Sequence, residues 1–341
     1  MQRIDTMKAD AFRHLVEKAR RIATVSHTHP DGDAVGSSLG MAHWLRSIGK
    51  ETFCFFPDPA PATLHFMLAG ENGGCPVFVF ENEPERSRQL LDSCDLIICL
   101  DFPNFSRTEP MAGVLADSPA AKVLIDHHPY PDTAPFSVCF SETDISSASE
   151  LVYWVLDAAR AEIPLPAATA LMTGMTTDTN NFANSVWPST FEMASRLLAR
   201  GVDRDAILQA LNWNYEERRL RAMGLLLERM TVTPKGVAYM ILDAATRDAF
   251  GLQDGETEGF VNLPLGIRNV RMSIFLKETD GHFRVSVRSK KGTSANRMAA
   301  ARFHGGGHEL AAGGKLYFPE DIPSPADAAA YIEQATDEEL D

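Results

Sequence analysis

The stretch His27-Thr-His-Pro-Asp31-Gly-Asp33-Ala-Val-Gly36-Ser37 joins an apolar run to a helical pattern. Residues 22–28 predict a buried strand, and residues 34–48 predict a helix. Pro30 and Gly32 favour a tight turn between the two. A strand that turns directly into a helix is the building unit of α/β proteins, so this stretch indicates an α/β fold.

The chain on either side of this stretch repeats the alternation of strand and helix. Further short apolar runs predict strands at residues 52–56, 76–80, 96–101 and 122–128, with a helix at residues 86–94. This order predicts a mostly parallel, doubly wound sheet. Ligands of such sheets bind beyond the carboxyl ends of the strands, so residues at those ends become candidates for function.

Beyond residue 147 the pattern changes to consecutive helices, predicted at residues 149–160, 167–179, 190–199, 204–211 and 216–230. Strands are predicted at residues 232–242, 270–278 and 282–289, the last two joined by a hairpin turn at Asp280-Gly281. Helices at residues 296–303 and 326–335 complete the pattern. We therefore predict a catalytic domain over residues 1–195, a helical linker over 196–228 and a smaller α+β domain over 229–341.

Composition narrows the class of protein. The chain of 341 residues carries 46 acidic and 32 basic side chains, a formal charge of −14. Such a balance argues against long DNA or RNA as the main ligand, whereas small phosphates remain compatible. The five cysteines form no Cys-x-x-Cys pair and are expected to be reduced thiols. Without a signal-like or membrane-spanning apolar run, we expect a cytoplasmic monomer or homodimer with no membrane partner.

Three candidate metal donors fall in the opening stretch: His27, Asp31 and Asp33. Taken alone, they fit a polar turn with an N-capping aspartate as well as they fit a metal site. The stretch also resembles part of a calcium loop, but it lacks the glutamate expected at the twelfth position.

Donors of the same kinds stand at the ends of two other predicted strands and one predicted helix. Asp101 ends an apolar strand, Asp126-His127-His128 ends the next strand, and Asp178 ends an apolar helix. A buried aspartate is costly unless it is paired or binds a metal. Because the strand ends meet at one edge of the sheet, four such clusters together predict a metal centre.

Charge counting favours two divalent cations. The six expected ligands supply four negative charges between them: His27, Asp31, Asp33, Asp101, His127 and Asp178. Mixed imidazole and carboxylate ligands suit Mn²⁺ best, with Co²⁺ or Mg²⁺ as alternatives. Two metals roughly 3.5–4 Å apart can share a hydroxide nucleophile. Asp101, Asp126 and His128 are then the expected catalytic residues, with Asp126 orienting His127 and His128 contacting phosphate.

The four motifs, in this order and spacing, resemble the DHH phosphoesterase superfamily, which includes RecJ nucleases, family II pyrophosphatases and oligoribonucleases. The resemblance implies that His27 and Asp31 serve one ion and that Asp33 and His127 serve the other. It further implies that Asp101 and Asp178 bridge or cap the pair.

The segment Phe303-His304-Gly305-Gly306-Gly307-His308 resembles the glycine-rich signature of the DHH-associated domain. Considered by itself, it also fits a flexible turn between two helices. Upstream, Arg288 and Ser289 end a strand, where an exposed basic strand end is the plainer interpretation. His304 stands where relatives often have a small residue, and it either crowds the loop or adds a phosphate contact. The expected substrate-binding residues are Arg268, Arg288, Ser289, Gly305, Gly306, Gly307 and His308.

Together these motifs resemble oligoribonucleases that also dephosphorylate 3′-phosphoadenosine 5′-phosphate. The resemblance implies an enzyme that degrades very short RNA oligonucleotides to mononucleotides and acts on small bisphosphorylated nucleotides. The alternatives are a phosphodiesterase for linear dinucleotides of the pApA or pGpG type, a RecJ-like exonuclease, and a nucleotide-binding module without turnover. Pyrophosphatases lack the glycine loop, and RecJ enzymes carry additional domains.

Overall fold

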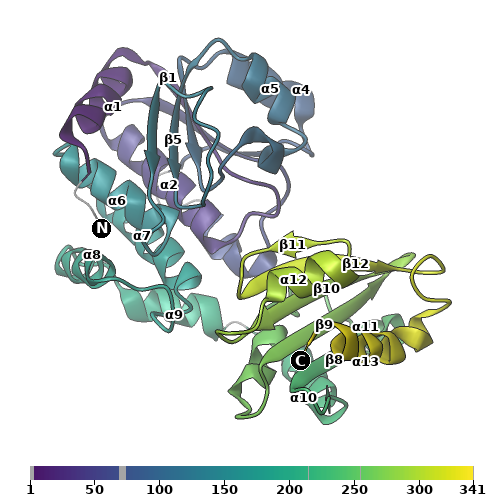
Figure 1. Cartoon of the computed structure of the whole chain (residues 1–341). Helices are drawn as coiled ribbons and strands as arrows, with labels where there is room; N and C mark the ends of the chain where they lie inside the picture. Colours follow the sequence, from purple (N-terminus) through teal and green to yellow (C-terminus); the bar gives the residue numbers. More distant parts are fainter. Residues whose placement is uncertain (1–3, 69–73, 214, 254, 341) are drawn as a thin grey trace. The chain divides into compact units, whose positions relative to one another are not determined.

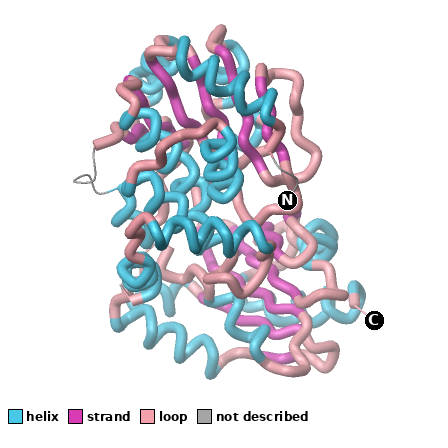
Figure 2. Tube along the Cα trace, turned by 90° about the vertical axis from the view of Figure 1, so that its left-hand side faces the viewer, coloured by secondary structure: helices cyan, strands magenta, loops and turns pink. Residues whose placement is uncertain are grey.

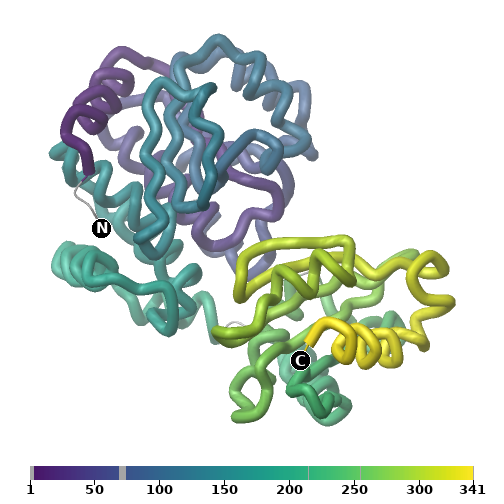
Figure 3. The backbone as a smooth tube through the Cα atoms, in the orientation of Figure 1, coloured from purple at the N-terminus to yellow at the C-terminus, as the bar shows by residue number. Residues whose placement is uncertain are grey.

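The computed structural model describes residues 4–68, 74–213, 215–253 and 255–340. The chain forms two compact units, Met1–Asn214 and Tyr215–Asp341, each described below by itself. Figure 3 follows the chain from the purple and teal residues of the first unit to the green and yellow residues of the second. Of the helices expected in a linker, α9 (Arg204–Asn212) belongs to the first unit and α10 (Glu217–Glu228) to the second.

The first unit is built on a six-stranded sheet with the order β3-β2-β1-β4-β5-β6, in which every neighbouring pair is parallel. The doubly wound α/β prediction is therefore confirmed. The strand order reverses between β1 and β4, the place where such sheets open a crevice for ligands. The strands are β1 (Arg21–Val25), β2 (Glu51–Phe56), β3 (Val77–Val79), β4 (Leu96–Leu100), β5 (Ala121–Asp126) and β6 (Val138–Ser141).

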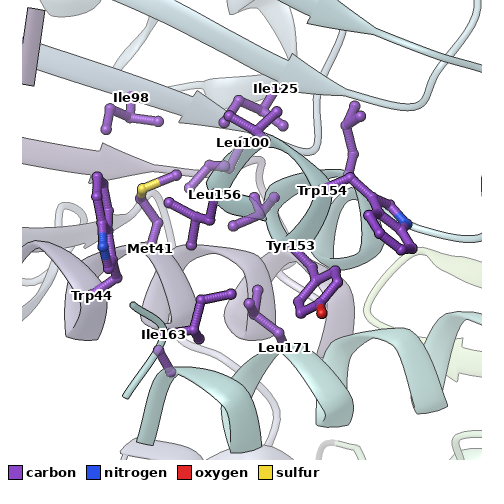
Figure 4. Close-up of a cluster of buried hydrophobic side chains, with 14 of the residues drawn as sticks. Met41, Trp44, Ile98, Leu100, Ile125, Tyr153, Trp154, Leu156, Ile163 and Leu171 are labelled. Carbon is purple, nitrogen blue, oxygen red and sulfur yellow. The ribbon is translucent and has the colours of Figure 1, made fainter. Parts of the chain in front are cut away.

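Helices cover both faces of this sheet (Figures 1 and 2). One apolar core joins the sheet to α1, α2, α6 and α7, and part of it is drawn in Figure 4, where Met41 and Leu171 lie below Leu100 and Ile125. A second core joins the opposite face to α4 and α5. The helices of this unit are α1 (Thr6–Lys18), α2 (Gly32–Ser47), α3 (His65–Leu68), α4 (Pro84–Asp92), α5 (Ala112–Asp117), α6 (Ala148–Ala158), α7 (Leu165–Asp178), α8 (Pro188–Ala199) and α9.

Helices α2 and α7 pack unusually closely. Gly32, Gly36 and Gly40 recur every four residues on α2 and all face α7. Because glycine has no Cβ atom, the backbone of α7 meets α2 directly at Gly36, while the side chains of Thr177 and Leu171 fill the space beside Gly32 and Gly40. The start of α2 thereby lies beside the end of α7, which brings the neighbourhoods of Asp33 and Asp178 together.

The second unit contains another six-stranded sheet, of order β11-β12-β10-β9-β8-β7, in which only the pair β8 and β9 is parallel. Helices α12 and α13 pack on one face and α10 on the other. The strands are β7 (Thr231–Val232), β8 (Val237–Leu242), β9 (Met272–Thr279), β10 (His282–Ser289), β11 (Gly306–Gly307) and β12 (Ala311–Tyr317). The helices are α10, α11 (Ala244–Phe250), α12 (Ala295–Arg302) and α13 (Ala328–Glu339).

Several local predictions differ from the structure. The single strand expected over residues 232–242 was wrong, because a turn with Gly236 at φ 74° separates β7 from β8. The hairpin at Asp280-Gly281 is confirmed by the antiparallel pairing of β9 and β10. Strand β12 was not predicted, since Ala-Ala-Gly-Gly has low strand propensity. Helix α1 and strand β6 were also missed. Within the described ranges, no helix is long and apolar enough to cross a membrane.

Candidate metal centre

All six expected ligands gather at one edge of the first sheet, together with His128. Their ligand atoms form three overlapping groups, and within each group they lie within 4.8 Å of one another. The groups are His27 with Asp31 and Asp101, Asp33 with His127 and Asp178, and Asp101 with His127 and His128. The donors come from the segments that follow β1, β4 and β5 and from the facing ends of α2 and α7.

Asp101 lies between two imidazoles. Its Oδ2 atom is 3.4 Å from His27 Nε2, and its Oδ1 atom is 3.4 Å from His127 Nε2. The residue directly follows β4, its side chain is only 3% exposed, and its backbone has φ 65°. A left-handed backbone is uncommon for a residue other than glycine, and aspartate tolerates it better than most. This conformation turns the carboxylate of a buried strand end into the middle of the cluster.

Asp31 and Asp33 are held by helix amides. Asp31 is the N-cap of α2, and its Oδ1 atom accepts hydrogen bonds from Asp33 N and Ala34 N, both at 3.0 Å. The buried carboxylate of Asp33 accepts from Ala148 N at 2.6 Å and from Ser149 N at 2.9 Å, in the first turn of α6. Capping and cation binding are therefore compatible in Asp31, because its second oxygen takes no part in the cap.

The Asp126-His127-His128 segment divides its side chains between two directions. His127 Nε2 lies 3.8 Å from Asp178 Oδ2 as well as near Asp101. Asp126 was expected to orient His127, but its Oδ1 atom instead contacts His128 Nδ1 at 2.8 Å. This contact fixes the ring of His128, whose Nδ1 atom is also 3.7 Å from Asp101 Oδ1.

The charged groups of the cluster shift one another's pKa values. Burial lowers the pKa of His27, but the attraction of Asp101 outweighs burial and raises it to about 9. In the same way, Asp101 and then Asp178 raise the pKa of His127 to about 10. Burial, followed by repulsion from Asp101, raises the pKa of Asp33 to about 7. Burial and repulsion from Asp33 raise the pKa of Asp178 well above its usual value. Protons on these groups relieve the repulsion between carboxylates, a role that bound cations can take over.

The donor set fits divalent cations. The Oδ1 atom of Asp101 is buried and accepts no hydrogen bond from the residues that the structure describes. The imidazole and carboxylate atoms around it face one another at 3.4 to 3.8 Å, longer than ordinary hydrogen bonds. Buried oxygens and ring nitrogens that converge without bonding directly are typical of a site built around metal.

Two features of this edge were not anticipated from the sequence. The amides of α6 that hold Asp33 were missed, although the Ser147-Ala-Ser-Glu150 spacing is a helix-start signal. His29 was also overlooked. It has φ 55°, and its backbone N and ring Nδ1 contact Asp58 at 2.7 and 2.5 Å. This anchor fixes the turn between His27 and Asp31.

In the second unit, the expected phosphate-binding residues gather at one end of the sheet. Arg288 is opposite Ala311 in the pairing of β10 with β12, and His308 N donates to Ala311 O at 2.7 Å. Arg288 is half-buried, and its Nη1 atom donates to Val287 O at 3.0 Å. Ser289 is buried, and its hydroxyl donates to Thr293 O at 2.7 Å. Arg268 is exposed, directly after Ile267, whose carbonyl accepts from Lys290 Nζ at 2.8 Å.

The glycine segment forms a tight hairpin within this sheet. A Cβ atom at Gly305 would lie 1.9 Å from Gly313 O, so the close approach of the two backbones requires glycine there. Gly306 and Gly307 form β11 and pair with β12, which excludes a turn between two helices. His304 points its ring to Asp321, with Nε2 and Oδ1 2.8 Å apart. The close backbone approaches at Gly305 and Gly307 require glycine at these two positions independently of any ligand.

Comparison with known proteins identifies the family. Residues 21–175 match the DHH family, N-terminal domain, and residues 235–333 match the DHHA1 domain. The "Bifunctional oligoribonuclease and PAP phosphatase NrnA" of Thermus thermophilus is 30% identical, over 86% of this chain and 84% of the relative. A probable NrnA of Streptococcus mutans is 29% identical, over 90% and 94%. The cyclic-di-AMP phosphodiesterase GdpP of Geobacillus thermodenitrificans is 27% identical, over 90% of this chain but 46% of the relative.

Solved structures agree in fold. An exopolyphosphatase-related protein from Bacteroides fragilis is 35% identical and superposes with a TM-score of 0.92, covering 99% of this chain and 98% of that one. RecJ of Thermus thermophilus in complex with Mn²⁺ is 15% identical, with a TM-score of 0.57 over 98% of this chain and 54% of RecJ, which supports the fold alone. The site at the edge of the first sheet and these matches together show that the chain is a member of the DHH family of phosphoesterases.

Proposed function

We propose that this protein hydrolyses very short oligoribonucleotides to mononucleotides and removes the 3′-phosphate of 3′-phosphoadenosine 5′-phosphate. The observation that carries the proposal is the position of Asp101, buried between His27 and His127 in the middle of the cluster. The names of the Thermus and Streptococcus relatives support this choice of substrates.

The proposed cofactor is a pair of divalent cations, with Mn²⁺ favoured because imidazole and carboxylate donors are mixed. His27, Asp31 and Asp101 would hold one ion, and Asp33, His127 and Asp178 the other. Such a pair supplies charge stabilisation for the attack of water on phosphorus. In hydrolysis, water adds to phosphorus, the bond to the leaving 3′ oxygen breaks, and that oxygen takes a proton.

His128 is the proposed contact to the reacting phosphate. Its Nδ1 atom contacts Asp126 Oδ1 at 2.8 Å and lies 3.7 Å from Asp101 Oδ1, which places the ring beside the centre of the cluster. Asp126 is therefore proposed to orient the ring, and its buried position keeps the orientation constant.

In the second unit, Arg268, Arg288, Ser289 and His308 are proposed to bind a second, terminal phosphate, beside the hairpin of Gly305, Gly306 and Gly307. Two of these groups already serve the fold, since Arg288 and Ser289 donate to backbone carbonyls. A phosphate could still accept from the remaining guanidinium atoms of Arg288, which present several donors.

The charge of −14 supports short substrates, because each added phosphate meets a net repulsive protein. We propose a cytoplasmic enzyme that acts as a monomer or homodimer and does not bind long nucleic acids. A second candidate is hydrolysis of linear dinucleotides, favoured by the match to a cyclic-di-AMP phosphodiesterase. Both activities would use the same cluster.

The decisive experiment is product analysis with purified protein and Mn²⁺. Substrates are RNA from two to ten nucleotides, pApA, pGpG and 3′-phosphoadenosine 5′-phosphate. Mononucleotides from the shortest RNA, and release of phosphate from the bisphosphate, support the proposal. Turnover of pApA or pGpG alone supports the second candidate. Binding without any product would refute both.

A further inference from the structure

A fully buried carboxylate lies in the first turn of α6, the helix whose amides hold Asp33. Glu150 is 0% exposed. It accepts four hydrogen bonds, from two groups of Ser146, from Thr190 at the start of α8 and from Trp154 on its own helix. One side chain thus joins the loop before α6 to the beginning of another helix.

The four donors are divided between both oxygens of Glu150. Oε2 accepts from Ser146 N at 3.1 Å, Ser146 Oγ at 2.5 Å and Thr190 Oγ1 at 2.7 Å. Oε1 accepts from Trp154 Nε1 at 3.1 Å. A glutamine has an acceptor on one side only, so it would turn its NH₂ group toward one of these donors. The arrangement therefore requires a carboxylate rather than any polar side chain of this size.

The amides at the start of α6 are all engaged, and two of them reach the metal cluster. Glu150 N donates to Ser147 Oγ at 3.0 Å, and Leu151 N donates to Ser147 O at 3.1 Å. Ala148 N and Ser149 N, which have no acceptor within the helix, both donate to Asp33. The position of the Asp33 carboxylate consequently depends on where this first turn lies.

We propose that Glu150 is a positioning residue for Asp33 and, through Asp33, for the ion that Asp33, His127 and Asp178 hold in the proposed function. Glu150 fixes the residue before the helix and ties it to Thr190, and the helix amides then fix the carboxylate of Asp33. Replacing Glu150 should therefore change the affinity for one ion of the pair and leave the other ion and the substrate contacts unaltered.

The test is Mn²⁺ titration of the intact, metal-stripped protein, with free Mn²⁺ measured by electron paramagnetic resonance. Orienting partners of metal ligands typically contribute roughly 10- to 100-fold in affinity. Glu150→Gln should weaken one of two binding steps by about that factor. Its activity should return near the wild-type value at excess Mn²⁺, with KM for a dinucleotide unchanged. Glu192→Gln, at an exposed position of α8, is the matched control and should bind both ions normally.

A purely structural role predicts a different result. In that case Glu150→Gln melts at a lower temperature, but the folded protein binds both ions with wild-type affinity, which would overturn the inference. Should Glu150→Gln fail to fold, Thr190→Val removes one donor to Oε2, together with the acceptor of Trp187 N, at nearly constant volume. That variant should weaken the same binding step by a smaller factor, and wild-type affinity for both ions overturns the inference equally. If the wild-type protein binds no Mn²⁺, the proposed function fails and this inference fails with it.

Discussion

A Cβ atom placed on Gly36 would lie 2.7 Å from the Cα atom of Gly174. The backbones of α2 and α7 therefore touch at a point between two parts of the metal cluster. Asp33 stands one turn before Gly36, and Asp178 stands one turn after Gly174. The contact between Gly36 and Gly174, where neither residue has room for a methyl group, therefore sets the separation of these two carboxylates.

We predict that Gly36→Ala destabilises the first unit, because the added methyl group must push the helices apart. Overpacking of this kind typically costs about 1–3 kcal/mol. The same displacement should lower the affinity for Mn²⁺, measured by titration beside thermal unfolding. Gly113→Ala is the control, since a Cβ atom there meets nothing within 4 Å. Equal unfolding temperatures for Gly36→Ala and the wild type would contradict the prediction.

Asp101→Asn should abolish hydrolysis and lower the amount of bound metal while unfolding remains cooperative. Asparagine tolerates the left-handed backbone of residue 101 and keeps the size of the side chain, so the change removes mainly charge. Metal content is measured by elemental analysis after desalting. Turnover is measured with a dinucleotide as the substrate. Asp117→Asn, on an exposed site at the end of α5, should behave as the wild type. Near-normal turnover of Asp101→Asn at saturating Mn²⁺ would show that Asp101 is not a ligand.

Metal binding should release protons and strengthen as the pH rises. The pKa values of His27 and His127 are raised to about 9 and about 10, so both rings carry a proton at pH 7 in the metal-free protein. A cation displaces those protons, and the cost of displacement falls as the pH approaches the raised pKa values. Titration calorimetry in two buffers of different ionisation enthalpy measures the release. Heats that do not depend on the buffer, or an affinity that falls between pH 6 and 9, would be inconsistent with this prediction.

The same raised pKa values predict how the metal-free protein responds to alkali. The stabilisation from the protonated imidazoles of His27 and His127 is fully present below their unfolded pKa of about 6.5 and is lost as the pH passes about 9 to 10. The metal-free protein should therefore unfold more readily at pH 10 than at pH 7. With Mn²⁺ bound, the rings are already neutral ligands, and the loss over this range should be smaller. Thermal unfolding with and without Mn²⁺ at both pH values measures the difference.

Arg288→Ala should raise KM for short oligonucleotides markedly and leave a chromogenic phosphodiester without a second phosphate nearly unaffected. A lost charge-assisted hydrogen bond costs about 1.5–3 kcal/mol, or roughly 10- to 150-fold in affinity. His308→Ala should act in the same direction. Arg284→Ala is the matched control, since Arg284 is an exposed residue on the same strand. An equal loss of activity on both substrates would assign these residues to folding or to the catalytic centre rather than to phosphate binding.

The sequence predicted the site residues whose own side chains and neighbouring apolar runs reveal their position. Asp101 and Asp126-His127-His128 could be found because each ends an apolar run, and parallel strands place their ends together. The partners of Asp33 at the start of α6 could not be found, because Ala148 and Ser149 contribute only backbone amides. The contact of Gly36 with Gly174 also escaped notice, since it depends on how two distant helices cross. Strand β12 was missed because pairing with β10 overrides the weak propensity of its glycines.

The positions of the donors along the chain also determine the order in which the donor groups are completed during synthesis. Protein chains emerge from the ribosome N-terminus first, and domains begin to fold before synthesis ends. The first donor group is complete when the ribosome reaches β5, since it consists of His27, Asp31 and Asp101. The group of Asp33 and His127 is complete only when Asp178, at the end of α7, has been synthesised. The two halves of the cluster thus become complete at different times. A chain that ends before α7 lacks Asp178, so the group of Asp33, His127 and Asp178 is the last of the three donor groups to be completed.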